Sequence, residues 1–281
     1  MTLEPPSPPA ASPPPAGDGW DPALYERFAA ERRQPFDDLV ALCHRVPGGT
    51  VVDLGCGPGT LTLELHRALG AARTIGLDRS PAMVAEARVR AEGVPGVHFV
   101  EGDLATVDVA ELAGGPVDLV AASASLHWVD GHRRLLAALR SALAPGGQLA
   151  FQVPANFAHP SHRLATRLAA TEPFASALGD RAPADRGRSV LAPEAYAELL
   201  FSFGATAQRV RLEVYGHVLE SSAAVLDWVG GTLLTPYRAA LPPALFEAFV
   251  ARYAAELAAE LGDRRPYFYA FPRVLAWARF P

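Results

Sequence analysis

The sequence predicts an α/β fold: a doubly wound, mostly parallel seven-stranded sheet with helical cap insertions before and after the sixth strand. Three observations predict it. Between residues 50 and 153, five short apolar runs alternate with helical stretches rich in Ala, Arg and Glu. A glycine-rich turn, "GCGPG", directly follows the first apolar run, and the alternation breaks down after Val153. Strands that alternate with helices indicate βαβ units and a parallel sheet with right-handed crossovers.

The residues before the first strand fall into two parts. Residues 1–19 contain seven prolines and no basic residue. A secretory signal needs a basic start, so this composition instead predicts a disordered Pro-rich tail. Residues 20–46, "WDPALYERFAAERRQPFDDLVALCHRV", predict one or two amphipathic helices. Asp21 can cap the first, and Pro35 is expected to interrupt the pattern.

Residues 20–153 are expected to contain these N-terminal helices and a ligand-binding α/β core. The turn "PGG" (Pro145–Gly147) is expected between the last core helix and the fifth strand. The predicted core helices are Thr60–Leu69, Ser80–Ala91 and Gly131–Ala144. The predicted strands are Val51–Leu54, Thr74–Leu77, His98–Glu101, Leu119–Ala122 and Leu149–Val153.

Residues 154–281 are expected to form helical cap insertions together with the last two strands of the same sheet. Residues 154–208 contain helical stretches broken by proline, and residues 218–262 are helical again. The two predicted strands are Arg209–Tyr215 and Phe271–Arg279. Open α/β sheets bind ligands at the carboxyl ends of their strands, so we expect the insertions to fold over that end.

Composition excludes several classes of protein. The net charge of -5 argues against a nucleic-acid surface, which needs clustered positive charge. Two cysteines, Cys43 and Cys56, are too few for a disulfide framework or a Cys-rich metal site, and no metal is predicted. No apolar run approaches the ~20 residues that cross a bilayer. We therefore expect a cytoplasmic protein without membrane contacts, and nothing in the sequence indicates an obligate protein partner.

The glycine turn has a carboxylate, Asp53, two residues before its first glycine. It could be a tight turn only, a nicotinamide dinucleotide site or a site for S-adenosylmethionine. The dinucleotide fingerprint is G-x-G-x-x-G/A, and Thr60 occupies its third glycine position here. The charge of Asp53 would also oppose a pyrophosphate. S-adenosylmethionine carries an ammonium and a sulfonium and no phosphate, so it suits this turn better.

Two more carboxylates follow strands at the same edge of the predicted sheet. Asp78 ends the second strand and can accept hydrogen bonds from both ribose hydroxyls of either cofactor. Asp103, in "VEGD", follows the third strand and can accept from the adenine amino group. One acidic residue after a strand is usually a helix cap. Three in succession favour a site for S-adenosylmethionine.

Several segments resemble known proteins. "VVDLGCGPGTLT", "GLDRSPAMVAEAR" and "FVEGDL" resemble the first three motifs of class I S-adenosylmethionine-dependent methyltransferases. "GWDPALYERFAAERRQPFDDLVA", "ASASLHWVDGH", "VPANFAHPSH", "DWVGGTLLTPYR" and "FPRVLAWAR" are similar, in order and spacing, to segments of trans-aconitate 2-methyltransferases. This second resemblance covers nearly everything after Gly19. It implies a methyltransferase that esterifies a carboxylate of a small polycarboxylic acid, most closely trans-aconitate.

The resemblance also implies roles for individual residues. Gln34 stands where the family often has an arginine, and Arg33 is expected on a solvated helix face. His127 and Trp128 are expected near the transferred methyl group. The implied cofactor-binding residues are Asp53, Gly55, Cys56, Gly57, Gly59, Asp78, Arg79, Met83, Asp103, Leu104, Ser123 and Leu126. The implied substrate-binding residues are Tyr25, Arg32, His127, Trp128, Arg188, Tyr196 and Arg273.

The chemistry separates three hypotheses. A carboxylate acceptor is ionised near neutral pH, because its pKa lies near ~4, and it needs arginine clamps rather than a general base. The alternative acceptor is a hydroxyl or carboxylate of a secondary metabolite; for a hydroxyl, His127 would serve as the base. A non-catalytic cofactor-binding protein is the third hypothesis, and the intact glycine turn disfavours it.

Overall fold

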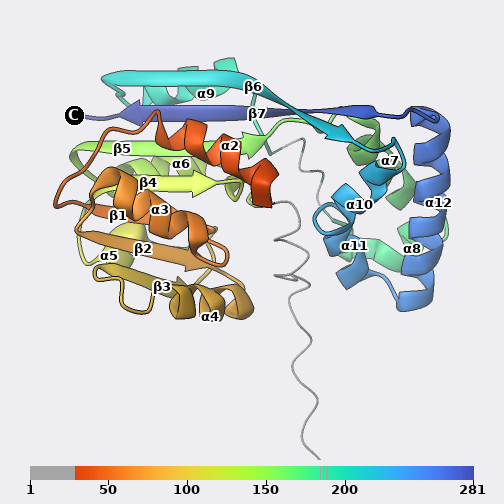
Figure 1. Ribbon diagram of the computed structural model, residues 1–281, viewed down its shortest axis with the longest axis horizontal. Helices are drawn as coiled ribbons and strands as arrows, with labels where there is room; N and C mark the ends of the chain where they lie inside the picture. The colour runs from red at the N-terminus through yellow and green to blue at the C-terminus, as the bar shows by residue number, and fades with distance from the viewer. Residues whose placement is uncertain (1–28, 184, 186, 188) are drawn as a thin grey trace, which may run out of the picture.

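Seven strands form one sheet in the order β3-β2-β1-β4-β5-β7-β6 (Figure 1). The computed structural model describes residues 29–183, 185, 187 and 189–281. Strands β1 to β5 run parallel to one another, and β7 runs antiparallel to both β5 and β6. The predicted mostly parallel sheet is therefore confirmed. The strands are β1 (Thr50–Leu54), β2 (Arg73–Asp78), β3 (Val97–Glu101), β4 (Val117–Ser123), β5 (Leu143–Pro154), β6 (Ala207–Leu219) and β7 (Tyr267–Arg279).

Helices cover both faces of the sheet. On one face α2 (Ala29–Val40), α3 (Thr60–Leu69) and α4 (Pro81–Arg90) bury side chains such as Val51, Phe99 and Trp277. The other face packs against α5 (Val109–Ala113), α6 (His132–Ser141) and α9 (Pro193–Ser202). The strand order reverses between β1 and β4, and such switch points are where open α/β sheets bind ligands.

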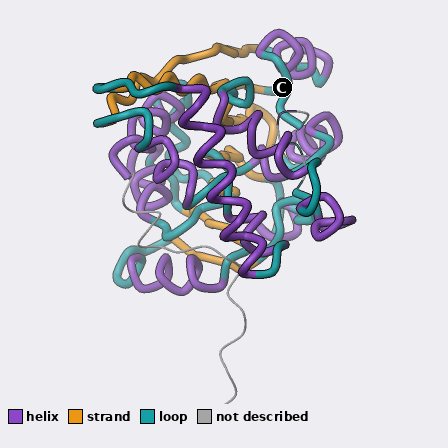
Figure 2. Tube along the Cα trace, turned by 90° about the vertical axis from the view of Figure 1, so that its right-hand side faces the viewer, coloured by secondary structure: helices purple, strands orange, loops and turns teal. Residues whose placement is uncertain are grey.

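A separate group of helices forms a cap with its own core. The short 3-10 turn η2 (Gly179–Arg181) directly follows one of them, α8 (Phe174–Leu178). Figure 1 shows the cap helices beyond the carboxyl ends of the parallel strands, and in Figure 2 they lie in front of the strands. The predicted insertions before and after the sixth strand are thus confirmed. The cap helices are α7 (Pro160–Ala169), α8 (Phe174–Leu178), α10 (Ala224–Gly230), α11 (Thr235–Ala240) and α12 (Pro243–Leu261).

The antiparallel pair of strands β6 and β7 connects the two cores. The last pair between β5 and β7 joins Pro154 to Arg273, whereas β6 and β7 remain paired as far as Leu219 and Tyr267. The β6–β7 pair therefore extends beyond the parallel strands into the cap, where Tyr269 and other aromatic residues pack. Both strands are longer than the predicted Arg209–Tyr215 and Phe271–Arg279, because pairing continues past the main sheet.

Three local predictions are corrected by the structure. Pro35 lies inside α2, and burial of Phe36 and Leu39 beyond it holds the helix together despite the lost backbone hydrogen bond. The "PGG" segment lies within β5, where the pairing with β4 shifts between Val117 and Leu119 and Gly146 has a φ of 79°. Helix α9, expected in the cap insertion, packs on the sheet instead.

The predicted tail, residues 1–19, lies outside the described residues. Within the part of the chain that the structure describes, no helix has the length and apolar character needed to cross a membrane. No group of three or more His, Cys, Asp or Glu side chains is arranged there to hold a metal ion.

Candidate functional site

The glycine turn after β1 is held by the end of β2. Both Gly55 and Cys56 donate backbone N–H bonds to the carbonyl of Leu77, at 2.7 and 3.0 Å. Gly57 donates its N–H to Asp78 Oδ2 at 2.9 Å. These three bonds attach the turn to the end of β2, and Gly55 and Gly57 line the cavity described below.

Gly55 can only be glycine in this turn. Its φ is 78°, a conformation that L side chains rarely adopt. A Cβ at this position would lie 2.3 Å from the Cβ of Ser125, which follows β4. Ser125 in turn donates its hydroxyl to the carbonyl of Leu54. The turns after β1 and β4 are thus in direct contact.

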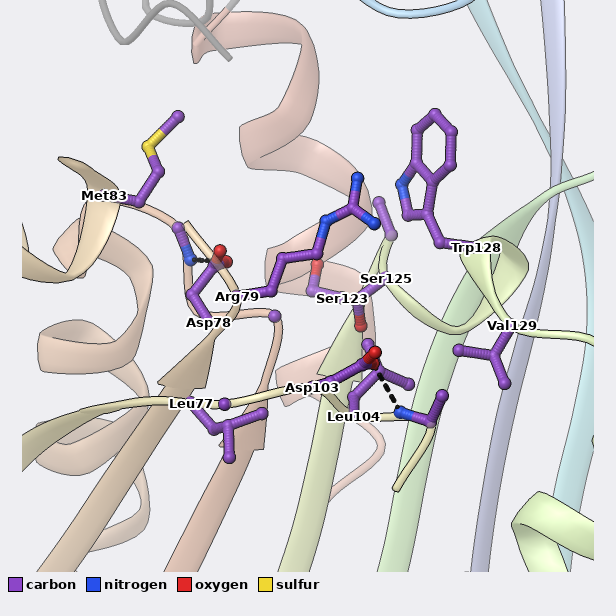
Figure 3. A pocket seen from close by; sticks show the side chains of 15 residues that line it. Leu77, Asp78, Arg79, Met83, Asp103, Leu104, Ser123, Ser125, Trp128 and Val129 are labelled. Carbon is purple, nitrogen blue, oxygen red and sulfur yellow. Dashed lines mark hydrogen bonds between the residues drawn. The ribbon is translucent and has the colours of Figure 1, made fainter. Parts of the chain in front are cut away.

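A cavity of about 160 Å³ opens at this edge of the sheet (Figure 3). Its walls come from the segments that follow β1, β2, β3 and β4. In Figure 3, Arg79 and Trp128 lie on one side of the cavity and Asp103 and Leu104 on the other. The lining residues are Gly55, Gly57, Leu77, Asp78, Arg79, Met83, Gly102, Asp103, Leu104, Ala105, Ser123, Ala124, Ser125, Trp128 and Val129.

Two carboxylates in this lining are fixed by backbone donors. Besides the bond from Gly57, Asp78 accepts the N–H of Ser80 on Oδ1 at 2.9 Å. Asp103 is exposed and accepts the N–H of Ala105 on Oδ1 at 2.8 Å. Carboxylate oxygens carry further lone pairs, so both groups can still accept bonds from hydroxyl or amino donors of a ligand.

Asp53 lies beneath the turn rather than in the cavity wall. Its side chain is buried, and Oδ2 accepts the hydroxyl of Thr62 at 2.6 Å. Burial raises the pKa of Asp53 to about 6, and the negative charge of Asp78 adds to the effect. A buried carboxylate in this state is stabilised in its ionised form by any cation that approaches the turn.

Most of the predicted cofactor residues line the cavity. Four do not belong to its described lining. Asp53 is buried under the turn, and Cys56 packs in a small core cluster with α4. Gly59 (φ 83°) allows close packing, because a Cβ there would lie 2.7 Å from the ring of Phe99. Leu126 is fully buried in the main core. The eight that line it are Gly55, Gly57, Asp78, Arg79, Met83, Asp103, Leu104 and Ser123.

Of the predicted substrate residues whose side chains the structure describes, only some lie at the cavity. Trp128 lines the cavity, and the ring of His127 lies 4.9 Å from the Trp128 ring without being part of the described lining. Tyr196 does not line the cavity: its side chain is fully buried in the core, with the hydroxyl 2.5 Å from His132 Nδ1. A tyrosine in an amphipathic helix serves packing as readily as binding, and here packing prevails.

Arg273 is buried near the carboxyl end of β5. Only 6% of its surface is exposed, and Nη1 donates to Gln152 Oε1 at 2.9 Å. Gln152 Nε2 donates to Ser123 Oγ at 3.0 Å, and Ser123 lines the cavity. The guanidinium carbon also lies 4.7 Å from the centre of the Phe271 ring. The buried guanidinium of Arg273 is therefore linked to Ser123, in the cavity wall, through the side-chain amide of Gln152.

Three substrate predictions fall outside what the structure describes: Tyr25, Arg188 and the side chain of Arg32. Arg33 is half exposed and forms ion pairs with Asp37 and Glu64 at 2.9 and 2.6 Å, as expected for a solvated helix face.

Several lining residues were not predicted from the sequence. Gly102 and Ala105 flank Asp103 in the segment after β3. Ala124 and Ser125 form the turn after β4, where Ala124 has a φ of 54°. A non-glycine residue in that conformation commonly marks a functional turn. The run of small residues in "ASAS" was the available signal, because small residues are needed where a turn contacts the Gly55 backbone.

A cluster of histidines and tyrosines, here called the cap cluster, lies where the β6–β7 pair enters the cap. His159 Nε2 lies 2.9 Å from the hydroxyl of Tyr267, and His162 Nδ1 lies 3.1 Å from Ser161 Oγ. The hydroxyl of Tyr269 lies 3.3 Å from the same Ser161 oxygen. Burial lowers the pKa of both histidines to about 4. This cluster joins α7 to β7 and stabilises the cap in its neutral state.

The sequence matches known proteins over nearly its whole length. A family model described as a methyltransferase domain matches residues 51–147. A trans-aconitate 2-methyltransferase of Deinococcus radiodurans is 42% identical over 265 residues, which cover 93% of this chain and 98% of the relative. The chain belongs to the trans-aconitate 2-methyltransferase family.

A second family member and one solved structure are also similar to this chain. The trans-aconitate 2-methyltransferase of Paracidovorax citrulli is 41% identical over 92% of this chain and 98% of its own length. The crystal structure of YcgJ from Bacillus subtilis superposes with a TM-score of 0.56 at 13% identity, covering 88% of this chain and 98% of that one. The last similarity concerns the fold alone.

Proposed function

We propose that this protein transfers the methyl group of S-adenosylmethionine to a carboxylate of trans-aconitate. The observation that carries this proposal is the cavity, where Asp78 and Asp103 face the space next to the glycine backbone of Gly55 and Gly57. Its chain is 42% identical to a trans-aconitate 2-methyltransferase. The proposal rests on that combination of site and family.

The cavity residues fit the cofactor. S-adenosylmethionine supplies an electrophilic methyl group when it is bound. Asp78 would accept from the ribose hydroxyls, and Asp103 would accept from the adenine amino group. Met83 and Leu104 provide apolar surface for the adenine ring. The ionised form of Asp53, beneath the turn, would attract the ammonium directly or through water.

The acceptor side needs orientation more than acid–base chemistry. A carboxylate near pH 7 is already a nucleophile, so no residue must remove a proton from it. Ser123 and Trp128 line the cavity; Ser123 is linked to Arg273 through Gln152, and Trp128 lies beside His127. Arg273 would hold a second carboxylate, because a guanidinium donates two parallel hydrogen bonds to such a group. Tyr25, Arg32, His127 and Arg188 remain proposed substrate contacts.

The reactants are both small molecules. We therefore also propose a cytoplasmic enzyme that acts without an obligate protein partner. Residues 1–19 are proposed to be a tail that takes no part in the site, and Val153 is proposed as the boundary between the core and the capped region.

The direct test is methyl transfer. The protein would be incubated with methyl-labelled S-adenosylmethionine and a panel of di- and tricarboxylates, and any ester would be identified by mass spectrometry. We expect labelled monomethyl trans-aconitate as the main product. Transfer to none of the carboxylates, with binding of the cofactor retained, would contradict the proposed acceptor.

One observation favours a second acceptor class. His127 lies beside Trp128, which lines the cavity, and a histidine near a substrate hydroxyl can act as its base. The alternative is therefore methylation of a hydroxyl, or of a carboxylate, in a secondary metabolite. The pH dependence of turnover separates a hydroxyl acceptor from a carboxylate, as the last prediction below explains.

A further inference from the structure

Two buried side chains, Arg273 and Gln152, and the partly buried Ser123 form a hydrogen-bonded row across β7, β5 and β4. Arg273 donates to Gln152 Oε1 at 2.9 Å, and Gln152 Nε2 donates to Ser123 Oγ at 3.0 Å. One end of the row is the candidate carboxylate clamp, and the other end lines the cavity. Through these two bonds, Gln152 connects Arg273 to Ser123.

The backbone of Gln152 adds a third connection. Its carbonyl accepts the N–H of Ala124 at 3.0 Å, in the turn where Ala124 has a φ of 54°. The Gln152 side chain is 2% exposed. A buried amide with its oxygen and its nitrogen both bonded has one favourable orientation, because any rotation leaves a buried polar atom unsatisfied. Gln152 therefore fixes the Arg273 guanidinium, the Ser123 hydroxyl and the strained turn together.

We propose that Gln152 is a positioning residue that aims Arg273 at a substrate carboxylate while leaving the guanidinium its full charge. An amide is neutral, so it orients the cation without offsetting its attraction for an anion. A carboxylate of the same shape would still accept from Arg273 and could accept from the Ser123 hydroxyl in place of donating to it, but it would compete with the substrate for the cation. This inference rests on the proposed function.

The chain contains a matched control on the same strand and the same face. Gln148 is 3% exposed, and its Oε1 accepts from Trp277 Nε1 and from the His44 N–H, both at 2.8 Å. Its Nε2 donates to the His44 carbonyl at 3.0 Å. Gln148 thus has the same burial and the same use of both amide ends. Four residues of extended chain place it ~13 Å from Gln152, away from the cavity.

The test compares Gln152→Glu, Gln152→Met and Gln148→Met with the wild type. For each protein, kcat and KM for trans-aconitate, the Kd of S-adenosylhomocysteine and the melting temperature would be measured. Gln152→Glu should raise KM about tenfold or more with a nearly unchanged Kd, since it alters charge and keeps geometry. Gln152→Met should lower kcat roughly 10- to 100-fold, because the Arg273 guanidinium and the Ser123 hydroxyl lose the amide that orients them. Gln148→Met should lower the melting temperature by a similar amount and leave kcat and KM within about twofold of wild type.

A double-mutant cycle tests the route through Arg273. In an Arg273→Met background, Gln152→Glu should raise KM no further, because the cation that it offsets is gone. Gln152→Glu decides the question even where Gln152→Met does not fold. A wild type that methylates trans-aconitate, with Gln152 variants that behave like Gln148→Met, overturns this inference alone. A wild type that transfers no methyl group to trans-aconitate overturns the proposed function as well.

Discussion

Asp78 accepts the backbone N–H of Gly57 at 2.9 Å, and this bond joins the end of β2 to the glycine turn after β1. The other oxygen of the same carboxylate accepts the N–H of Ser80 at 2.9 Å. Asp78 also lines the cavity. One side chain therefore both holds the glycine turn and faces the cavity, so a change at Asp78 alters both.

Asp78→Ala should weaken the binding of S-adenosylhomocysteine by about 1–3 kcal/mol, because hydrogen bonds to a charged acceptor are lost. Isothermal titration calorimetry measures this directly. Asp118→Ala is the control: Asp118 Oδ2 accepts the Thr50 N–H at 2.7 Å at the opposite end of β1. That variant should melt earlier with an unchanged Kd. Equal affinities in the two variants would contradict a ligand role for Asp78.

Gly55→Ala should destabilise the protein more than a glycine replacement at a position of equal φ. Gly93 has a φ of 77°, and a Cβ added there would meet no other atom within 4 Å. Gly93→Ala should therefore cost only the backbone strain of about 1–2 kcal/mol. In Gly55→Ala the new Cβ would also overlap Ser125. We expect a larger drop in melting temperature and a loss of cofactor binding. If the two variants melt together, the two turns are not in rigid contact.

The core of the fold could be predicted because its signals are local. Each strand of the parallel sheet is a short apolar run, and the three carboxylates of interest lie in or just after the carboxyl ends of the first three strands. Parallel strands bring their carboxyl ends to one edge, so Asp78 and Asp103 had to meet near the turn after Asp53. The cavity lining confirms Asp78 and Asp103 as neighbours of that turn.

Other features of the fold and the site could not be predicted, because they depend on contacts between residues far apart in the sequence. Tyr196 fits a ligand role and a core role equally well in the sequence, and only its bond to His132 decides. Pro35 breaks isolated helices, yet packing of α2 on the sheet offsets the lost bond. The partnership of Gln152 with Arg273 spans 121 residues, so it could not be predicted before β5 and β7 were known to pair.

Binding of S-adenosylhomocysteine should tighten as pH rises through about 6. Burial raises the pKa of Asp53 to about 6, so below that pH the carboxyl is neutral and attracts no ammonium. Titrations between pH 5 and 7.5 measure the effect, and Asp53→Asn should abolish it. Thr62→Val removes the donor at 2.6 Å that favours the ionised form, and should move the rise to higher pH. A pH-independent Kd in the wild type would exclude the proposed role.

Free energy of unfolding should fall between pH 6.5 and 4 because of the cap cluster. Burial lowers the pKa of His159 and His162 to about 4, whereas histidines in the unfolded chain bind protons near ~6.5. In that window the unfolded state holds more protons, so stability is present above pH 6.5 and is lost as pH falls. His162→Gln should flatten the decline in urea titrations by roughly 1–2 kcal/mol. The control is His98→Gln, at an exposed position on β3, which should leave the decline unchanged.

Turnover should be independent of pH above about 6 when cofactor and acceptor are saturating. A carboxylate with a pKa near ~4 is fully ionised there, so the chemical step requires no proton transfer. Histidine acting as a base on a hydroxyl would instead give a rising limb near ~6.5. His127→Gln separates the cases, because glutamine keeps a polar group beside Trp128 and cannot take up a proton. For a carboxylate acceptor, kcat of this variant should stay within about threefold of wild type, with the same flat profile. A rising limb in the wild type that disappears in His127→Gln would replace trans-aconitate with a hydroxyl acceptor.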